Sequence, residues 1–88
     1  MKLTTRHTGI LRLFGKNLKT ARKRRYPSAQ QFAHKLGLEP HTYRMYERGK
    51  SEPNFETLTR ICEELGITPN ELLPAASGRQ RPSQAASA

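Results

Sequence analysis

The 88-residue sequence has one cysteine, no tryptophan and no acidic residue before position 39. Because a lone cysteine, Cys62, can neither form an internal disulfide nor complete a zinc framework, the sequence excludes both and points to a reducing, cytoplasmic setting. Long apolar runs are also absent, and a mean hydropathy of −0.82 excludes a transmembrane helix. The stretch 10–14 is too short and is interrupted by Arg12, so no signal peptide is predicted.

The sequence also lacks a pattern typical of catalysis. The three histidines, His7, His34 and His41, are isolated from any nucleophile or carboxylate cluster, and no glycine-rich phosphate loop is present. A chain of this length leaves little room for a catalytic cleft. We therefore expect no enzyme activity, no catalytic residues, no metal site and no cofactor.

What the sequence does have is an uneven distribution of charge. The formal net charge is +9, and all seven acidic residues lie at or after Glu39. Most of the 16 lysines and arginines precede that position: Lys2, Arg6, Arg12, Lys16, Lys19, Arg22, Lys23, Arg24, Arg25 and Lys35. This asymmetry predicts that one half of the domain faces a polyanion. Charge alone leaves DNA, RNA, an anionic membrane surface and a merely solvated face as alternatives.

Residues 28–49 are predicted to form two short helices around a tight turn. Ser28 and Gln31 have the spacing of a capping box, which satisfies two unpaired donors at a helix start. Gly37 suits the end of that helix because it adopts positive φ without a Cβ clash. The apolar stripe of this helix, 29–36, consists of Phe32, Ala33 and Leu36.

The second helix of this pair is predicted over 40–48. Pro40 is suited to its first turn, where the missing N–H costs little. Tyr43 and Tyr46 share its inner face, and Gly49 closes it. The small side chain of Ala33 favours a close, steep crossing of the two helices.

Further helices are predicted on both sides of this pair. The first, over about 9–25, has Thr8 as its N-cap, and Pro27 follows its end. Asn54 caps another helix over about 55–65, which Gly66 ends, and a capping box at Thr68–Glu71 opens a short fifth helix that ends before Pro74. The apolar stripes of the two longer helices are Leu11, Phe14, Leu18, Ala21 and Leu58, Ile61, Cys62, Leu65.

The paired helices resemble the helix-turn-helix of the phage-repressor and Cro-like (XRE) family of DNA-binding regulators, from about Phe14 to Leu73. The resemblance implies a compact, all-α, five-helix domain of the lambda-repressor type over 9–74. It also implies a partly buried ion pair between Arg22 and Glu47 that locks the first helix to the motif; two surface charges are the alternative. Residues 1–8 are predicted to be a flexible basic arm, which tracks DNA or is simply an untied terminus, and 75–88 a disordered tail.

The resemblance implies that helix 40–48 lies in the major groove of double-stranded DNA. The outward residues expected to read bases are Pro40, His41, Thr42, Arg44 and Met45, and Arg44 is the best candidate for guanine. The residues expected at phosphates are Ser28, Gln30, Arg48, Lys50 and Asn54, at or near helix starts. An ordinary exposed helix position is the alternative for each.

The predicted function is that of a small bacterial or phage transcriptional regulator, a repressor, that binds a two-fold operator as a homodimer. The predicted dimer surface includes Leu72 and Leu73 or Ile67, although these residues could instead complete the core of the monomer. The competing hypothesis is an antitoxin-type module that uses the same fold to bind a protein partner. No membrane partner is expected.

Overall fold

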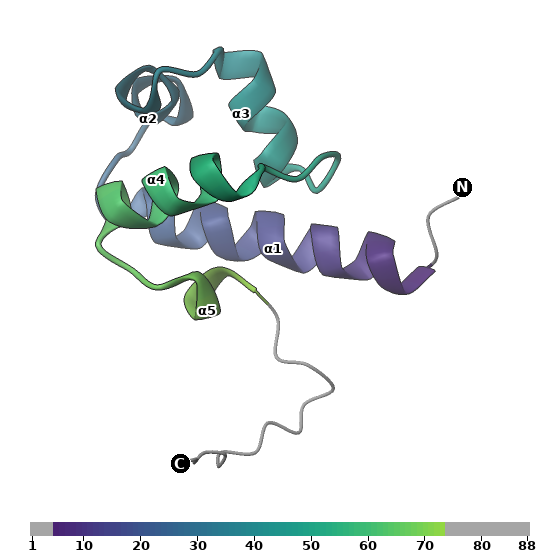
Figure 1. Cartoon of the computed structure of the whole chain (residues 1–88). Coiled ribbons are helices and arrows are strands. Elements are labelled where there is room, and N and C mark those ends of the chain that lie inside the picture. Colours follow the sequence, from purple (N-terminus) through teal and green to yellow (C-terminus); the bar gives the residue numbers. More distant parts are fainter. Residues whose placement is uncertain (1–4, 74–88) are drawn as a thin grey trace, which may run out of the picture.

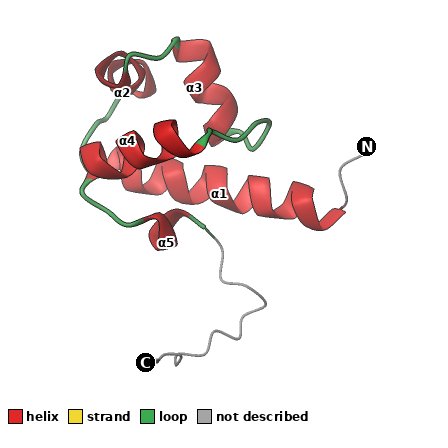
Figure 2. Ribbon diagram, in the orientation of Figure 1, coloured by secondary structure: helices red, strands yellow, loops and turns green. Residues whose placement is uncertain are grey.

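The computed structural model describes residues 5–73, with side chains from residue 7 onward, and within this part of the chain the structure consists of helices and the turns between them (Figures 1 and 2). The helices are α1 (Thr5–Lys23), α2 (Ala29–Leu36), α3 (Pro40–Glu47), α4 (Phe55–Leu65) and α5 (Pro69–Leu72). The all-α prediction is confirmed, although α5 is only a single turn of four residues. The predicted tail at 75–88 and the first four residues of the predicted arm lie outside the described residues.

Helix α1 begins and ends earlier than its sequence predicts. It starts at Thr5 rather than near Gly9, so Thr8 lies inside the helix and is not its N-cap, and residues 5–8 are helical rather than a loose arm. At the other end, Arg25 N donates to Arg22 O (3.0 Å) and Tyr26 N donates to the same oxygen (2.7 Å). These bonds form a tight turn that ends the helix before Arg24.

The ends of α2 and α4 follow the predicted caps. The Ser28 side chain accepts a hydrogen bond from Gln31 N (3.2 Å), and Asn54 Oδ1 accepts one from Thr57 N (2.8 Å). The reciprocal bond from the Gln31 side chain to the Ser28 backbone is not formed, so the first predicted capping box is only half present. Gly37 and Gly66 end these helices with φ of 78° and 68°, the left-handed region that glycine adopts without strain.

Helix α1, the longest helix, runs below α3 and α4 and above α5 in the view of Figure 1. It packs against α3 and α5, while α2 packs against α3 and α4. The predicted apolar stripes all face this core, and Leu58 is half-buried at its edge. The buried apolar side chains are Leu11, Phe14, Leu18, Ala21, Phe32, Ala33, Leu36, Tyr43, Tyr46, Ile61, Cys62, Leu65 and Leu72.

Two glycines allow α1 to approach the end of α3 at backbone distance. A Cβ atom placed on Gly15 would lie 2.6 Å from Tyr46 O and would also clash with Glu47 O. A Cβ on Gly49, which has φ of 72°, would lie 2.8 Å from the Arg12 Cα. Because neither position has room for a side chain, the C-terminal end of α3 rests directly on the α1 backbone.

Candidate nucleic-acid interface

Helix α3 is oriented by the two tyrosines on its inner face. Tyr43 is fully buried and its ring meets Phe32 of α2 edge-on, with ring centroids 5.3 Å apart. Tyr46 is also buried and packs edge-on against Tyr43 at 6.2 Å. The opposite face of the helix is therefore directed outward. On that face His41 and Thr42 are exposed, and Pro40, Arg44 and Met45 are half-buried.

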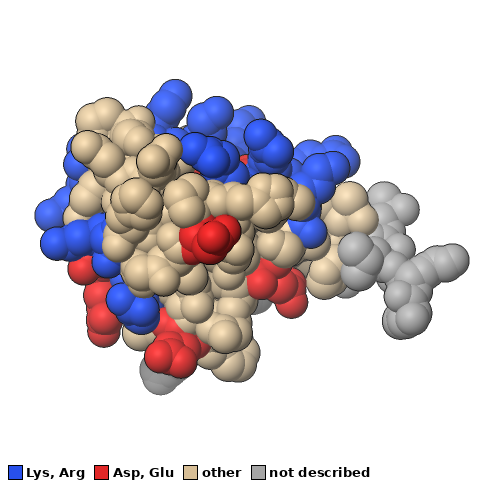
Figure 3. Space-filling model, turned by 90° about the horizontal axis from the view of Figure 1, so that it is seen from above, with Lys and Arg blue, Asp and Glu red and all other residues tan. Residues whose placement is uncertain are grey.

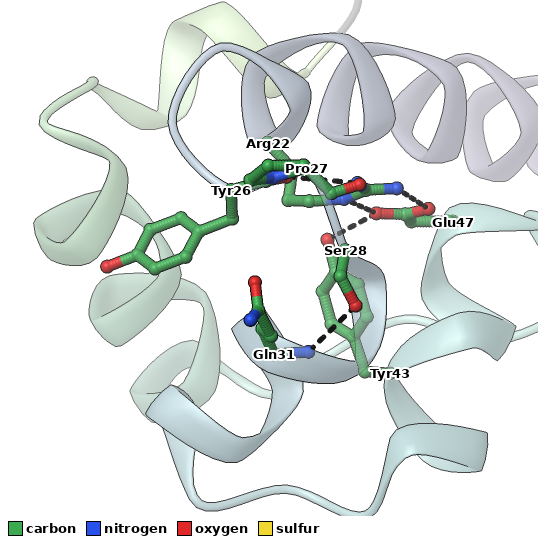
Figure 4. Close-up of polar contacts among 7 residues, drawn as sticks. All are labelled: Arg22, Tyr26, Pro27, Ser28, Gln31, Tyr43 and Glu47. Atoms are coloured by element: carbon green, nitrogen blue, oxygen red, sulfur yellow. Dashed lines mark hydrogen bonds and ion pairs between the residues drawn. The ribbon is translucent and has the colours of Figure 1, made fainter.

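The orientation of α3 is also held by a buried ion pair to α1. Arg22 Nε donates to Glu47 Oε2 (2.9 Å) and Arg22 Nη2 donates to Glu47 Oε1 (3.1 Å), a bidentate contact. The two side chains are only 5% and 9% exposed. The Tyr43 hydroxyl donates to Glu47 Oε2 as well, so the carboxylate receives donors from two helices (Figure 4).

Arg22 also fixes the turn that leads into α2. Its Nη1 donates to the carbonyl oxygens of Tyr26 (3.0 Å) and Pro27 (2.8 Å), directly before the Ser28 cap (Figure 4). One guanidinium therefore joins the end of α1, the start of α2 and the end of α3. The hydrogen bonds to Glu47 raise the pKa of Arg22, so the guanidinium stays charged. Burial, reinforced by the hydrogen bond to Glu47, raises the pKa of Tyr43.

A positively charged pocket lies beside this ion pair, where α1, α2 and α3 meet. It has a volume of about 240 Å³ and is lined by Lys19, Arg22, Ala29, Arg44, Glu47 and Arg48. Glu47 is already engaged by Arg22, which leaves Lys19, Arg44 and Arg48 as the cations of the pocket. Ala29 is the first residue of α2, where backbone N–H groups and the helix dipole favour an anion. The pocket therefore has the chemistry to accept a phosphate group.

The basic character continues along α1. Arg12, Lys16, Lys19 and Lys23, here called the α1 basic stripe, are all exposed and recur at steps of three or four residues, so they share one side of the helix. Figure 3 shows lysine and arginine side chains gathered along one edge of the molecule, with most acidic side chains away from it. No member of this stripe was among the predicted phosphate contacts, although its helical spacing could have revealed it.

The predicted phosphate contacts lie at the two helix starts and just after α3. Gln30, Arg48, Lys50 and Asn54 are exposed, and Ser28 is half-buried. The side-chain oxygens of Ser28 and Asn54 already accept backbone hydrogen bonds within their own helices. Their contribution is therefore to order the helix starts, whereas Arg48 and Lys50 bring charge.

The described residues hold no group of three or more His, Cys, Asp or Glu side chains that could bind a metal ion. Cys62 is buried on α4, and burial raises the pKa of its thiol, which suits a core residue rather than a nucleophile. Within residues 5–73, no helix has the length and apolar character needed to span a membrane.

Comparisons with known proteins match this architecture. Residues 15–77 match the model of the helix-turn-helix domain family. The chain is 39% identical over 61 residues to YonR, an SPbeta prophage-derived uncharacterized HTH-type transcriptional regulator of Bacillus subtilis, a match that covers 69% of this chain and 56% of that protein. It is 35% identical over 68 residues to YqaE, an uncharacterized HTH-type transcriptional regulator of the same organism, covering 77% of this chain and 59% of the relative.

The chain thus spans less than two thirds of the length of these two relatives. Among solved structures it is similar to the SOS-response transcriptional repressor LexA from Eubacterium rectale, with a TM-score of 0.68 and 16% sequence identity. That likeness covers 83% of this chain and 74% of the LexA chain, and at this identity it is a likeness of fold.

Proposed function

The chain belongs to the helix-turn-helix domain family, and on this premise we propose that it binds double-stranded DNA and regulates transcription. The observation that carries the proposal is the convergence of three elements on one basic face: the outward side of α3, the start of α2 and the α1 basic stripe. Helix α3 enters the major groove, and the flanking elements hold the phosphate backbone.

In this proposal the base-reading residues lie on the outward side of α3. His41 and Thr42 are the exposed residues of its first turn and meet base edges, while Pro40 and Met45 supply apolar contacts. Arg44 reads a guanine through a bidentate contact, worth about 1–3 kcal/mol of discrimination. Its place in the pocket with Lys19 and Arg48 also brings it within the phosphate-binding region, so its role is the most informative one to test.

The backbone contacts come from the helix starts and from the α1 basic stripe. Phosphates meet the start of α2 at Ser28 and Gln30 and the start of α4 at Asn54, with Arg48, Lys50 and Lys19 supplying charge. The protein acts as a repressor in the cytoplasm and occupies a two-fold operator as a homodimer, because a single small domain covers too little DNA for tight binding.

The test is selection of bound duplexes from a random DNA pool, performed with the wild type and with Arg44→Ala. The wild type is expected to enrich a defined half-site. If Arg44 reads a base, Arg44→Ala loses preference at one position and keeps it elsewhere, whereas uniform weakening assigns Arg44 to phosphate. Failure of the wild type to enrich any sequence would overturn the proposed specific binding. Arg60→Ala replaces an exposed arginine of α4 that is not among the proposed DNA contacts; it is the matched control and should select the same half-site.

A further inference from the structure

Four large apolar side chains of the described residues are exposed, and three of them, Ile10, Phe55 and Leu73, line one groove. Phe55, the first residue of α4, is 87% exposed, and Leu13, Leu73 and Ile10 are 47%, 44% and 39% exposed. A phenylalanine so fully in water contributes nothing to the core of the monomer. Exposed apolar side chains that share one groove are typical of an interaction site.

A groove adjoins Phe55. It has a volume of about 180 Å³, and its walls come from α1, the α3–α4 loop, α4 and the end of α5. Among the described residues, Glu52 is the one charged residue that lines it. Its apolar lining consists of Ile10, Leu11, Phe14, Pro53, Leu58 and Leu73, with Phe55 itself on one side. A dry apolar cavity of about 150 Å³ is enough to bind benzene, so this groove can receive one phenyl ring.

We propose that this groove is the surface through which two copies of the chain associate, with Phe55 of each copy inserted into the groove of the other. The inference rests on the proposed function, which requires a dimer on a two-fold operator. A two-fold interface must be self-complementary, because the same patch meets itself. A protruding aromatic ring beside a groove of matching size satisfies that requirement, and an aromatic anchor in a pocket is the usual centre of an interface.

The charge of the groove favours a second copy of this chain as the occupant. Two molecules that each carry a formal net charge of +9 repel one another across most of their surfaces. Among the described residues, the side chains that line the groove include no lysine or arginine; the charged one is Glu52, whose Oε1 lies 3.9 Å from His7 Nε2. Two copies that meet through this lining therefore avoid placing the α1 basic stripe of one copy against that of the other.

The groove borders the proposed DNA-binding face at the start of α4, where Pro53 and Phe55 flank Asn54. None of the lining residues is itself among those proposed to contact bases or phosphates, and α1 contributes Ile10, Leu11 and Phe14 to the groove rather than members of its basic stripe. The surface also differs from the one predicted from the sequence. Leu72 is fully buried and Ile67 packs against the core, so both complete the monomer, and Leu73 alone of that set contributes to the patch.

The proposal is tested with the full chain by sedimentation equilibrium at low and high protein concentration. The wild type is expected to show a monomer–dimer equilibrium, and Phe55→Ser is expected to weaken it by about 100-fold or more, because both symmetric insertions are lost. Since Phe55 is exposed, the melting temperature of the Phe55→Ser variant should remain close to that of the wild type. Arg60→Gln, on the exposed side of the same helix and outside the groove, is the matched control and should dimerise normally.

A second measurement locates the contact. A mixture of Phe55→Cys and Leu73→Cys chains keeps one of the two Phe55 insertions, so it is studied at a protein concentration far above that needed to dimerise the wild type. Oxidised and then alkylated before denaturation, it should yield a disulfide-linked heterodimer, because Leu73 lines the groove that residue 55 of the other chain enters. The native Cys62 is buried, so it does not react while the chain is folded. The alkylating agent stays in the solution during denaturation and modifies the Cys62 thiol as soon as it becomes exposed. Absence of the heterodimer, or cross-linking that is equal for an Arg60→Cys partner, would overturn the assignment.

Two further outcomes would overturn the proposal. One is a wild type that stays monomeric at all concentrations, which leaves the groove to another protein or to another segment of the chain. The other is a Phe55→Ser chain that dimerises like the wild type. Binding to a half-site duplex, which a single copy can occupy, distinguishes a failure of the dimer proposal from a failure of the proposed function. Phe55→Ser should bind this duplex with the same affinity as the wild type. A wild type that does not bind it would count against the proposed function itself.

Discussion

Arg22 and Glu47 lie 25 residues apart in the sequence and form a bidentate ion pair that is almost completely withdrawn from solvent. The pair is fully provided with partners, because Arg22 also binds two backbone carbonyl oxygens and Glu47 accepts from the Tyr43 hydroxyl. A buried charge is tolerated only under such conditions. The pair therefore acts as a joint between α1 and α3 rather than as a surface contact.

Removing one charge of this joint should be strongly destabilising. Glu47→Gln leaves the Arg22 guanidinium buried opposite a neutral amide, and breaking a buried pair in this way costs about 3–5 kcal/mol. In a domain of this size that loss lowers the melting temperature by roughly 12 °C or more. Thermal unfolding followed by circular dichroism measures the effect. Glu56→Gln, on an exposed glutamate, is the control, and an unchanged melting temperature for Glu47→Gln would rule the joint out.

The glycine contact between α1 and α3 makes a second prediction. Gly15→Ala inserts a Cβ against the carbonyl oxygens at the end of α3, so we expect a loss of several kcal/mol, more than the roughly 1–3 kcal/mol of ordinary overpacking. Gly9→Ala, in the same helix with nothing within 4 Å of its Cβ, should instead stabilise by about 0.4–1 kcal/mol. Urea unfolding of the two variants compares them directly. Equal effects would mean that the helices do not approach as closely as described.

The buried tyrosine predicts a dependence of stability on alkaline pH. Because the pKa of Tyr43 is raised in the folded state, the folded chain keeps this proton where the unfolded chain, with a tyrosine pKa of about 10, releases it. The stability that Tyr43 contributes is therefore complete below pH ~10 and falls by up to about 1.4 kcal/mol per pH unit above it. The difference in unfolding free energy between the wild type and Tyr43→Phe should stay constant from pH 7 to 9 and shrink at higher pH. A difference that is flat through pH 11 would contradict this.

The α1 basic stripe predicts a specific change in DNA binding. Lys19→Gln removes one cation from the pocket where α1 meets the start of α2, so affinity should fall about equally for all duplex sequences. The slope of log K against log salt should become shallower by about 0.9, the value for one phosphate contact. Fluorescence anisotropy across a salt series measures both. Arg60→Gln serves as the comparison, and a Lys19→Gln slope equal to that of the wild type would remove Lys19 from the interface.

The sequence predicted the helices whose ends carry local chemistry. Helices α2 and α4 begin after a capping side chain at Ser28 or Asn54 and end at Gly37 or Gly66, so their bounds could be predicted to the residue. For α1, Thr8 was predicted as the N-cap, so the turn that begins at Thr5 was missed. The inner face of α3 could also be predicted from the sequence, because two tyrosines three residues apart lie on one side of a helix.

Features that depend on tertiary packing could not be predicted in the same way. Gly15 occupies the middle of a helix, and only the proximity of the α3 carbonyls gives it a reason to be there. The exposure of Phe55 could likewise not be predicted, because the sequence pattern places this residue at the start of an amphipathic helix without showing which way its side chain points. The Arg22–Glu47 pair was predicted from the family resemblance rather than from spacing, since nothing local links two residues so far apart.

The hydrogen bonds and the ring contact that join α3 to α1 and α2 are made by Glu47 and Tyr43, with Tyr46 buried beside Tyr43 on the same inner side. The outward positions, 40–42, 44 and 45, support none of the hydrogen bonds or ring contacts that fix its orientation. The residues that fix the orientation of α3 and the residues proposed to read bases are thus different residues of the same helix. If the proposed function holds, a library randomised at His41, Thr42, Arg44 and Met45 can be screened for altered DNA sequence preference on an unaltered scaffold, so the proposed reading surface is open to redesign without rebuilding the architecture of the domain.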